Sequence, residues 1–129
     1  YYKYKAGDQF TEGGKPVNGK RDICDIYAIM YETSESVPTL DGTNAFTSPN
    51  LISTARINNA KETNEWTYFK LPFTTLPGKF IDKEKLTMGK YNISIVFTSS
   101  LEGDHFNGAI GSTLLIDEAE LIYRSDLDH

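Results

Sequence analysis

The stretch YNISIVFTSSLEGDHFNGAIGSTLLIDEAELIY, residues 91–123, decides the fold of this chain. Its first eight residues alternate apolar and mostly polar side chains, which is the period of a β-strand with one face toward a core. Residues 99–105 are small or charged and include a glycine, so a turn is expected there. A last strand is predicted over 112–123, and its apolar run Leu114–Ile116 favours a strand covered on both faces. The stretch therefore predicts two long strands joined by a polar loop and a glycine-rich connection.

Three glycines, Gly103, Gly108 and Gly111, lie close together in that connection. Glycine adopts positive-φ backbone readily and lets another backbone approach closely, because it has no Cβ atom. We therefore expect tight turns or close packing in this segment. Further on, the pair Asp117-Glu118 interrupts the last strand and favours a β-bulge.

Four further segments outside this stretch have strand patterns, namely 1–5, 22–32, 51–59 and 65–73. Alternating aromatic and basic residues over 1–5 suit an edge strand. One helical turn is expected around 82–85. Five or more strands separated by turn clusters, without a convincing amphipathic helix, predict an all-β fold, an antiparallel β-sandwich.

A set of residues in the second half of the chain carries a resemblance to a known family. The set is Trp66…Phe69-x-Leu71-Pro72-Phe73, then Ser99-Ser100…Gly103-Asp104-x-Phe106-x-Gly108-Ala109-x-Gly111-Ser112-x-Leu114-x-x-Asp117-Glu118-x-Glu120-Leu121. The chain thereby resembles the putative carbohydrate metabolism domain, found near the C-terminus of secreted or surface proteins of gut-type Gram-negative bacteria. The resemblance implies a jelly roll like that of carbohydrate-binding modules, an extracellular, periplasmic or cell-surface location, and a glycan as partner. It implies no catalytic residue.

Length and composition limit the classes of function. With 129 residues, we expect a single β-sandwich domain over 1–129 that buries a core without disulfides. The net charge is −5 and no basic patch occurs, which argues against nucleic acid and anionic membranes as partners. No apolar run of about 18 residues occurs, so membrane insertion is not expected. Because the sequence begins at Tyr1 rather than Met, we expect a domain excised from the C-terminal part of a larger protein, with other domains of the same chain as neighbours.

The strand predicted over 22–32 offers the first candidate binding surface. One face is small and apolar and is expected in the core, while the other carries tyrosines and a carboxylate and is expected to face water. Sugars stack their C–H faces on exposed aromatic rings, and their hydroxyls bind carboxylates and guanidinium groups. The predicted glycan platform consists of Asp25, Tyr27, Tyr31, Arg56, Trp66 and Tyr68. The alternative is that these aromatics, Tyr27 and Trp66 above all, fill the covered side of a sheet.

The loop after the 91–98 strand offers the second candidate surface. It follows Ser99 and Ser100 and has hydroxyl, carboxylate, imidazole and aromatic groups at a strand end, where sandwiches usually display binding residues. The predicted binding residues of this loop are Asp104, His105, Phe106 and Asn107. The alternative is that Asp104 and the serines cap backbone groups in a tight turn, and that Phe106 fills the core.

Oxygen ligands suited to calcium occur at Asp41, Asn44 and Asp117, although without EF-hand spacing. A structural calcium ion is therefore the one cofactor that the sequence suggests. Zinc is not expected, because His105 and His129 lie far apart in the sequence.

Signals for catalysis are weak. A glycosidase needs two carboxylates about 5–10 Å apart. Glu118 with Glu120, or Glu102 with Asp104, would share a strand face, but 18 acidic residues produce such pairs by chance. No nucleophile elbow, P-loop or dinucleotide fingerprint occurs.

We therefore predict a non-catalytic carbohydrate-binding module of a secreted or cell-surface glycan-utilisation protein. The alternatives are a structural or adhesion spacer that binds protein, and a glycoside hydrolase. Aromatic rings exposed in a groove favour sugar binding. Buried rings without a groove favour the spacer, and a deep cleft with two facing carboxylates favours the enzyme.

Overall fold

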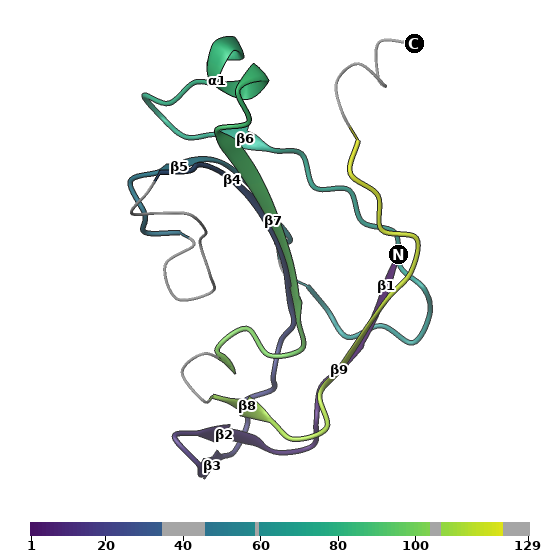
Figure 1. The fold of residues 1–129 in the computed structure, drawn as a ribbon. Coiled ribbons are helices and arrows are strands. Elements are labelled where there is room, and N and C mark those ends of the chain that lie inside the picture. Colours follow the sequence, from purple (N-terminus) through teal and green to yellow (C-terminus); the bar gives the residue numbers. More distant parts are fainter. Residues whose placement is uncertain (35–45, 59, 104–106, 123–129) are drawn as a thin grey trace.

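The structure is a computed structural model that describes residues 1–34, 46–58, 60–103 and 107–122. This part of the chain is nearly all β, with antiparallel sheets arranged in layers and one short helix (Figure 1). The predicted all-β fold is confirmed. The jelly-roll connectivity stays a prediction.

β4 (Asp25–Glu32) is the centre of the first layer. It pairs along its whole length with β7 (Tyr91–Thr98) on one side. On the other side it pairs with β5 (Leu51–Arg56), which pairs in turn with the two-residue β6 (Thr74–Thr75). The order of this sheet is β6–β5–β4–β7. The strands that the sequence predicts for β4, β5 and β7 are confirmed.

β1 (Tyr2–Lys5) and β9 (Thr113–Ile116) form the second layer, together with the extended chain around Thr67 (Figure 1). β1 pairs with β9 on one side. On its other side Tyr2 and Thr67 exchange two backbone hydrogen bonds of 2.8 and 2.9 Å. β1 therefore has two neighbours, and the edge position predicted for it is wrong.

β9 is shorter than the predicted last strand and, among the described residues, pairs with β1 alone. Only Leu114 and Ile116 pack against the core between the layers, while Leu115 is half exposed. The expectation that this run is covered on both faces is therefore wrong. Glu118 has a φ of 53°, so the chain leaves the strand there instead of continuing through a bulge.

A small sheet closes one end of the layers, built from β2 (Phe10–Glu12), β3 (Lys15–Val17) and β8 (Gly108–Ala109) in the order β3–β2–β8. At the opposite end of Figure 1 lies α1 (Lys83–Thr87). It begins after Asp82, whose carboxylate accepts a hydrogen bond from the N–H of Glu84 at 2.8 Å and caps the helix. The predicted helical turn is thus confirmed. In the described ranges, no helix combines the length and apolar character needed to cross a membrane.

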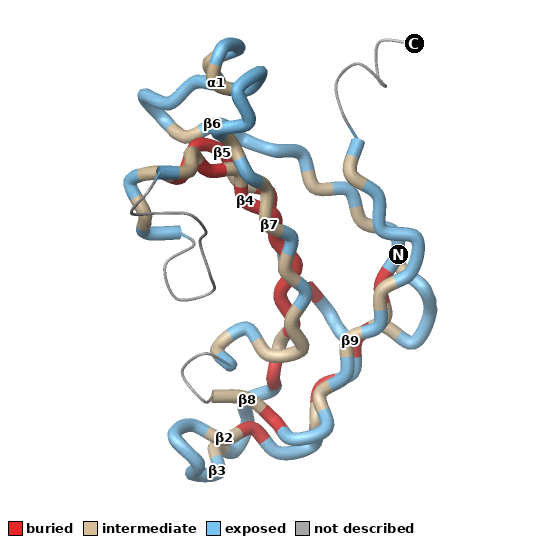
Figure 2. Tube along the Cα trace, viewed as in Figure 1, coloured by how far each residue is buried: buried red, intermediate tan, exposed pale blue. Residues whose placement is uncertain are grey.

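Buried side chains lie on both faces of β4, and Figure 2 shows burial running along this strand. The group between the two layers consists of Tyr2, Tyr4, Ala6, Cys24, Ile26 and Ala60, with Phe69, Leu71, Leu114 and Ile116 packed against it. The group on the other face consists of Tyr27, Ile29, Tyr31 and Leu51. The first layer is therefore covered on both sides along its central strand.

Candidate functional site

The tyrosine-bearing face of β4 is not an open surface. Tyr27 is 6% exposed and Tyr31 is 2% exposed. The side chains packed with them are Ile29, Leu51, Leu76 and Val96. The ring of Phe46 also lies edge-on to Tyr27, with the centroids 4.9 Å apart. The predicted exposure of Tyr27 and Tyr31 is therefore wrong, because apolar side chains from neighbouring strands and from the chain before β5 cover them.

Asp25 and Arg56 lie together as predicted, but they bind each other. Arg56 donates from Nε to Asp25 Oδ1 at 3.1 Å and from Nη2 to Oδ2 at 2.6 Å. The guanidinium carbon also lies 4.5 Å from the ring centroid of Phe46. Asp25 is buried, and a two-bond pair of this kind fixes both side chains. The pair belongs to the packing, and Asp25 is not accessible to a sugar.

Trp66 and Tyr68 lie in the second layer, and both rings are exposed. The ammonium group of Lys3 lies 4.9 Å from the Trp66 ring centroid. Tyr68 is 66% exposed and meets Tyr1 edge to face, with the centroids 5.6 Å apart. The strand predicted over 65–73 is wrong, because this segment makes only an isolated bridge at Thr67, although residues 66–71 do alternate between exposed and partly buried side chains. The alternative that placed Trp66 in the core is wrong.

Three of the four residues predicted in the second binding surface, Asp104, His105 and Phe106, lie outside the described residues. Asn107 is described, and its Oδ1 accepts a hydrogen bond from the N–H of Gly13 at 3.1 Å. This contact connects the β8 segment to the turn between β2 and β3. It is a structural contact, and it leaves the binding role of the loop a prediction.

Asp22 is a buried carboxylate that the sequence analysis did not single out. Its Oδ2 accepts hydrogen bonds from Ser100 Oγ at 2.5 Å and Ser112 Oγ at 2.7 Å. The same oxygen accepts from the N–H of Ala109 at 3.0 Å, and Oδ1 accepts from the N–H of Ile23 at 2.9 Å. Hydrogen bonds to a charged group are among the strong ones in proteins. Asp22 therefore fastens the chain before β4 to the segments after β7 and before β9, and we call these contacts the Asp22 network.

Two glycines beside the Asp22 network leave no room for a side chain. A Cβ atom on Gly108 would lie 2.8 Å from Ser100 Oγ, and one on Gly7 would lie 2.1 Å from the carbonyl oxygen of Ile110. Gly111 has a φ of 89°, in the left-handed region that favours glycine. The predicted tight turns and close packing are thus confirmed at Gly108 and Gly111.

Tyr4 links the same end of the molecule to the core. Its hydroxyl donates to the carbonyl oxygen of Ser99 at 2.7 Å. Burial raises the pKa of Tyr4 to about 12, because the phenolate would lose its hydration. The group is therefore a neutral hydrogen-bond donor at neutral pH.

The calcium site stays a prediction. Asp41 and Asn44 lie outside the described residues, and Asp117 is exposed next to the backbone of Tyr1. Within the described ranges, no three His, Cys, Asp or Glu side chains are placed to hold a metal ion. Cys24 is buried, and burial raises its pKa to about 11, so it stays a neutral thiol.

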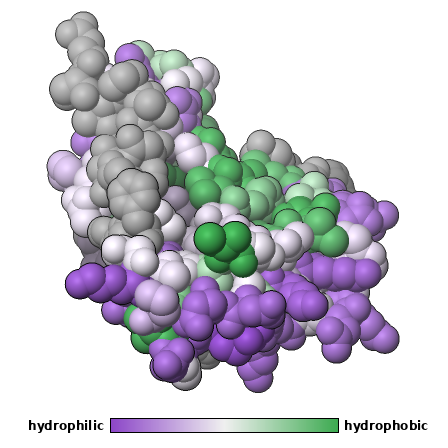
Figure 3. Space-filling view, turned by 90° about the horizontal axis from the view of Figure 1, so that it is seen from below, coloured by the Kyte–Doolittle hydropathy of each residue, from purple (hydrophilic) through white to green (hydrophobic). Residues whose placement is uncertain are grey.

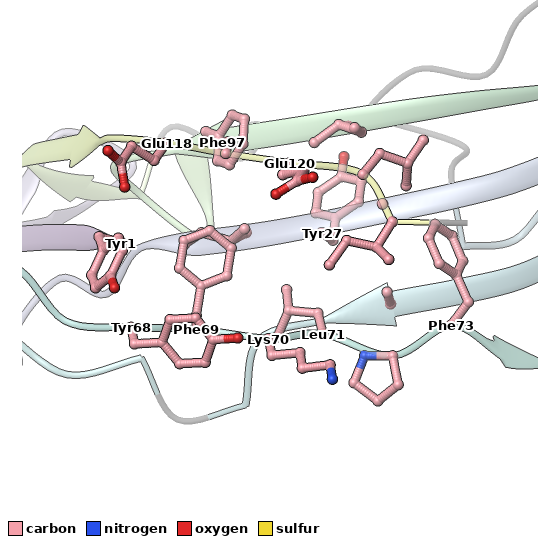
Figure 4. Close-up of a pocket in the computed structure, with 18 residues that line it drawn as sticks. Tyr1, Tyr27, Tyr68, Phe69, Lys70, Leu71, Phe73, Phe97, Glu118 and Glu120 are labelled. Atoms are coloured by element: carbon pink, nitrogen blue, oxygen red, sulfur yellow. The ribbon is translucent and has the colours of Figure 1, made fainter. Parts of the chain in front are cut away.

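An open cavity of about 620 Å³, here called the groove, lies between the two layers beyond the sealed core. Its floor is formed by the small or apolar side chains of Ala28, Ala55, Ile95 and Phe97 from the first layer. The chain segments 68–73 and 118–122 form its walls (Figure 4). Figure 3 shows apolar side chains gathered on one part of the surface beside hydrophilic ones.

The rim of the groove carries its polar and charged groups, which are Tyr1, Tyr68, Lys70, Glu118 and Glu120. In Figure 4, Glu118 and Glu120 lie on the side opposite Tyr68 and Lys70. The sequence predicted an exposed Tyr68 correctly, but it did not indicate that 118–122 would lie across from it. The rim therefore combines exposed rings with carboxylates and one ammonium group.

Comparison with known families gives a clear assignment. The sequence profile of the putative carbohydrate metabolism domain matches residues 1–122. The chain belongs to this family. A search of curated proteins found no match.

Two solved structures are similar to this putative carbohydrate metabolism domain. One is a putative glycoside hydrolase from Bacteroides thetaiotaomicron VPI-5482, 89% identical over 96% of this chain, with a TM-score of 0.94. The other is a putative glycoside hydrolase from Bacteroides vulgatus ATCC 8482, 48% identical over 95% of this chain, with a TM-score of 0.87. This chain spans 36% of the first and 49% of the second.

The motif that carried the family resemblance has a structural role in this putative carbohydrate metabolism domain. Ser100 and Ser112 supply hydroxyls to Asp22, and Ala109 supplies its N–H. Gly108 leaves the space that these groups need. These four residues therefore hold strands together and do not line the groove, whereas other residues of the motif, such as Phe69, Glu118 and Glu120, do line it.

Proposed function

We propose that this chain is a non-catalytic carbohydrate-binding module that holds sugar at the rim of the groove. The observation that carries the proposal is the exposed ring of Tyr68, which lies across the groove from Glu118 and Glu120 (Figure 4). A sugar ring would stack its C–H face on Tyr68 or Tyr1, and its hydroxyls would bind the two carboxylates and Lys70. Family membership supports a carbohydrate ligand.

Binding is favoured over hydrolysis by the placement of the acidic groups. Glu118 and Glu120 belong to one wall, and the opposite wall contributes Tyr68 and Lys70 to the lining. A glycosidase acts with two carboxylates that flank the scissile bond, one as acid and one as base or nucleophile. This arrangement fits recognition of hydroxyl groups better than cleavage.

The spacer alternative is supported in part by the burial of Tyr27 and Tyr31. Against it, rings remain exposed in a groove, at Tyr68 and Tyr1. We therefore keep sugar binding as the proposal. The module would belong to a secreted or surface protein of a Gram-negative bacterium, outside the cytoplasm, where weak single contacts gain strength through multivalency.

Affinity electrophoresis tests this proposal, with the chain run in gels that contain plant or microbial polysaccharides. Calorimetry then measures the affinity for oligosaccharides of any polysaccharide that retards the chain. Tyr68→Ala is expected to weaken binding about tenfold, which corresponds to ~1.4 kcal/mol. Trp66→Ala is the matched control, because Trp66 is an exposed ring on the same segment that does not line the groove. Retardation by no polysaccharide, or equal losses in both variants, would overturn the proposal. Repeating the gels with chelator tests the predicted calcium ion.

A further inference from the structure

We propose that the β7 side of the groove floor is covered by an extended segment of the parent polypeptide from outside residues 1–129, which pairs with the edge of β7 that the described residues leave open. The inference concerns the floor and does not rest on the proposed sugar site at the rim. It assigns a protein partner to a surface that the described residues leave open.

Two apolar side chains of β7 point to the space between the layers and are nevertheless exposed. Ile95 is opposite Ala28 and Phe97 is opposite Ile26 in the register of β7 with β4, so both belong to the face that forms the core. Even so, Ile95 is 49% exposed and Phe97 is 40% exposed. The side chains of a segment beside β7 that point to the same face would lie next to Ile95 and Phe97 and cover them. The groove floor is continuous with the core between the layers, so apolar side chains of a polypeptide would fit on the floor as they do in the core.

The outer edge of β7 lacks the residues that usually protect a strand edge. Within the described part of the chain β7 is the terminal strand of its sheet, and its sequence YNISIVFT contains no charge, proline or glycine. Natural proteins protect exposed edges with charges, proline or very short strands. Among the other edge strands of the described residues, β3 contains Lys15 and Pro16 and β6 and β8 have two residues each, while β9 (TLLI) is an uncharged edge of only four residues. An unprotected edge of eight residues is expected to pair with another strand.

The lengths of two similar solved chains indicate what kind of segment would pair with β7. This chain spans only 36% and 49% of two similar solved chains, so those proteins carry additional polypeptide beside the matched part. An extended segment provides backbone N–H and C=O groups at strand spacing and apolar side chains on one face, and β7 needs both. A sugar would supply neither to Ile95 and Phe97.

Thiol labelling tests the proposal. Ile95→Cys places a reporter on the floor, and Leu115→Cys is its control, because Leu115 is 48% exposed on the outer face of β9. Cys24 does not interfere, since it is buried and its pKa is raised to about 11. Both variants are labelled at neutral pH in the 129-residue chain and in the longer natural polypeptide.

We expect the Ile95→Cys thiol to react as fast as the control in the 129-residue chain, and about tenfold or more slowly in the longer polypeptide. The control should react equally in both. Equal reaction of Ile95→Cys in both forms would overturn the proposal. Protection in the 129-residue chain that grows with protein concentration would also overturn it, in favour of a second copy.

Hydrogen exchange of the unmodified protein gives the same test without a substitution. The β7 amides that are not bonded to β4 should exchange fast in the short chain and slowly in the longer polypeptide. Fast exchange in both would contradict the pairing. The outcome of the sugar-binding experiment with Tyr68→Ala does not affect the labelling or the hydrogen-exchange result. Each of the two proposals can therefore be disproved without the other.

Discussion

The Asp22 end and the groove end of the molecule are built from the same two layers, but they differ in what joins them. At the first end a buried carboxylate, two serine hydroxyls and closely packed glycines hold the layers together, and the core is sealed. At the second end no such fastening occurs among the described residues, and inward-facing apolar side chains line an open groove. The difference separates a structural end from an end that is available for binding.

The largest expected effect is at the fastened end. Asp22→Ala would leave two hydroxyls and a buried N–H without their acceptor, so we expect the free energy of unfolding to fall by about 3 kcal/mol or more. Urea denaturation at neutral pH measures it. Asp22→Asn, which keeps one acceptor oxygen, should lose less. A change below about 0.5 kcal/mol in Asp22→Ala would show that the network does not hold the layers.

A smaller effect is expected from close packing at the same end. Gly7→Ala would place a Cβ atom 2.1 Å from a backbone oxygen, and we expect a loss of about 2 kcal/mol because the backbone must shift. Gly103→Ala is the control, since its nearest contact would be an ordinary 3.5 Å. Thermal melts of both variants measure this difference in stability. Similar melting temperatures for the two would contradict the packing described here.

Sequence reasoning predicted the strands and their alternation, but not which faces would be covered. The period of two placed Tyr27 and Tyr31 on one face correctly, yet burial of that face depends on Leu51, Leu76 and other distant residues. The same period placed Tyr68 outward correctly, because one side of its segment packs on the core.

The Asp22 network shows why a site built from distant residues escapes sequence reasoning. Ser100 and Ser112 lie 78 and 90 residues from Asp22 along the chain. The available signal was the motif of serines and glycines that carried the family resemblance. That signal indicated a constrained segment, but not the carboxylate that the segment binds.

The smallest effect concerns pH. The pKa of Tyr4 is raised to about 12 in the folded chain, against an ordinary value near 10. The stability that neutral Tyr4 contributes is therefore complete below pH ~10 and is lost as the pH rises from ~10 toward 12. Tyr4→Phe should cost about 1 kcal/mol at pH 8, where its hydrogen bond is lost. Denaturation curves of the two proteins should converge at alkaline pH, and a constant difference would count against this role of Tyr4.

The most direct test of the comparison uses two neighbouring residues in the register of β4 with β7, namely Ile26, which is 2% exposed in the core between the layers, and Phe97, which is 40% exposed on the groove floor. The measurement is the free energy of unfolding of Ile26→Ala and Phe97→Ala in the 129-residue chain. We expect a loss of about 2–4 kcal/mol for Ile26→Ala and less than about 1 kcal/mol for Phe97→Ala. Equal losses would show that the groove is closed in this chain, and would contradict the account.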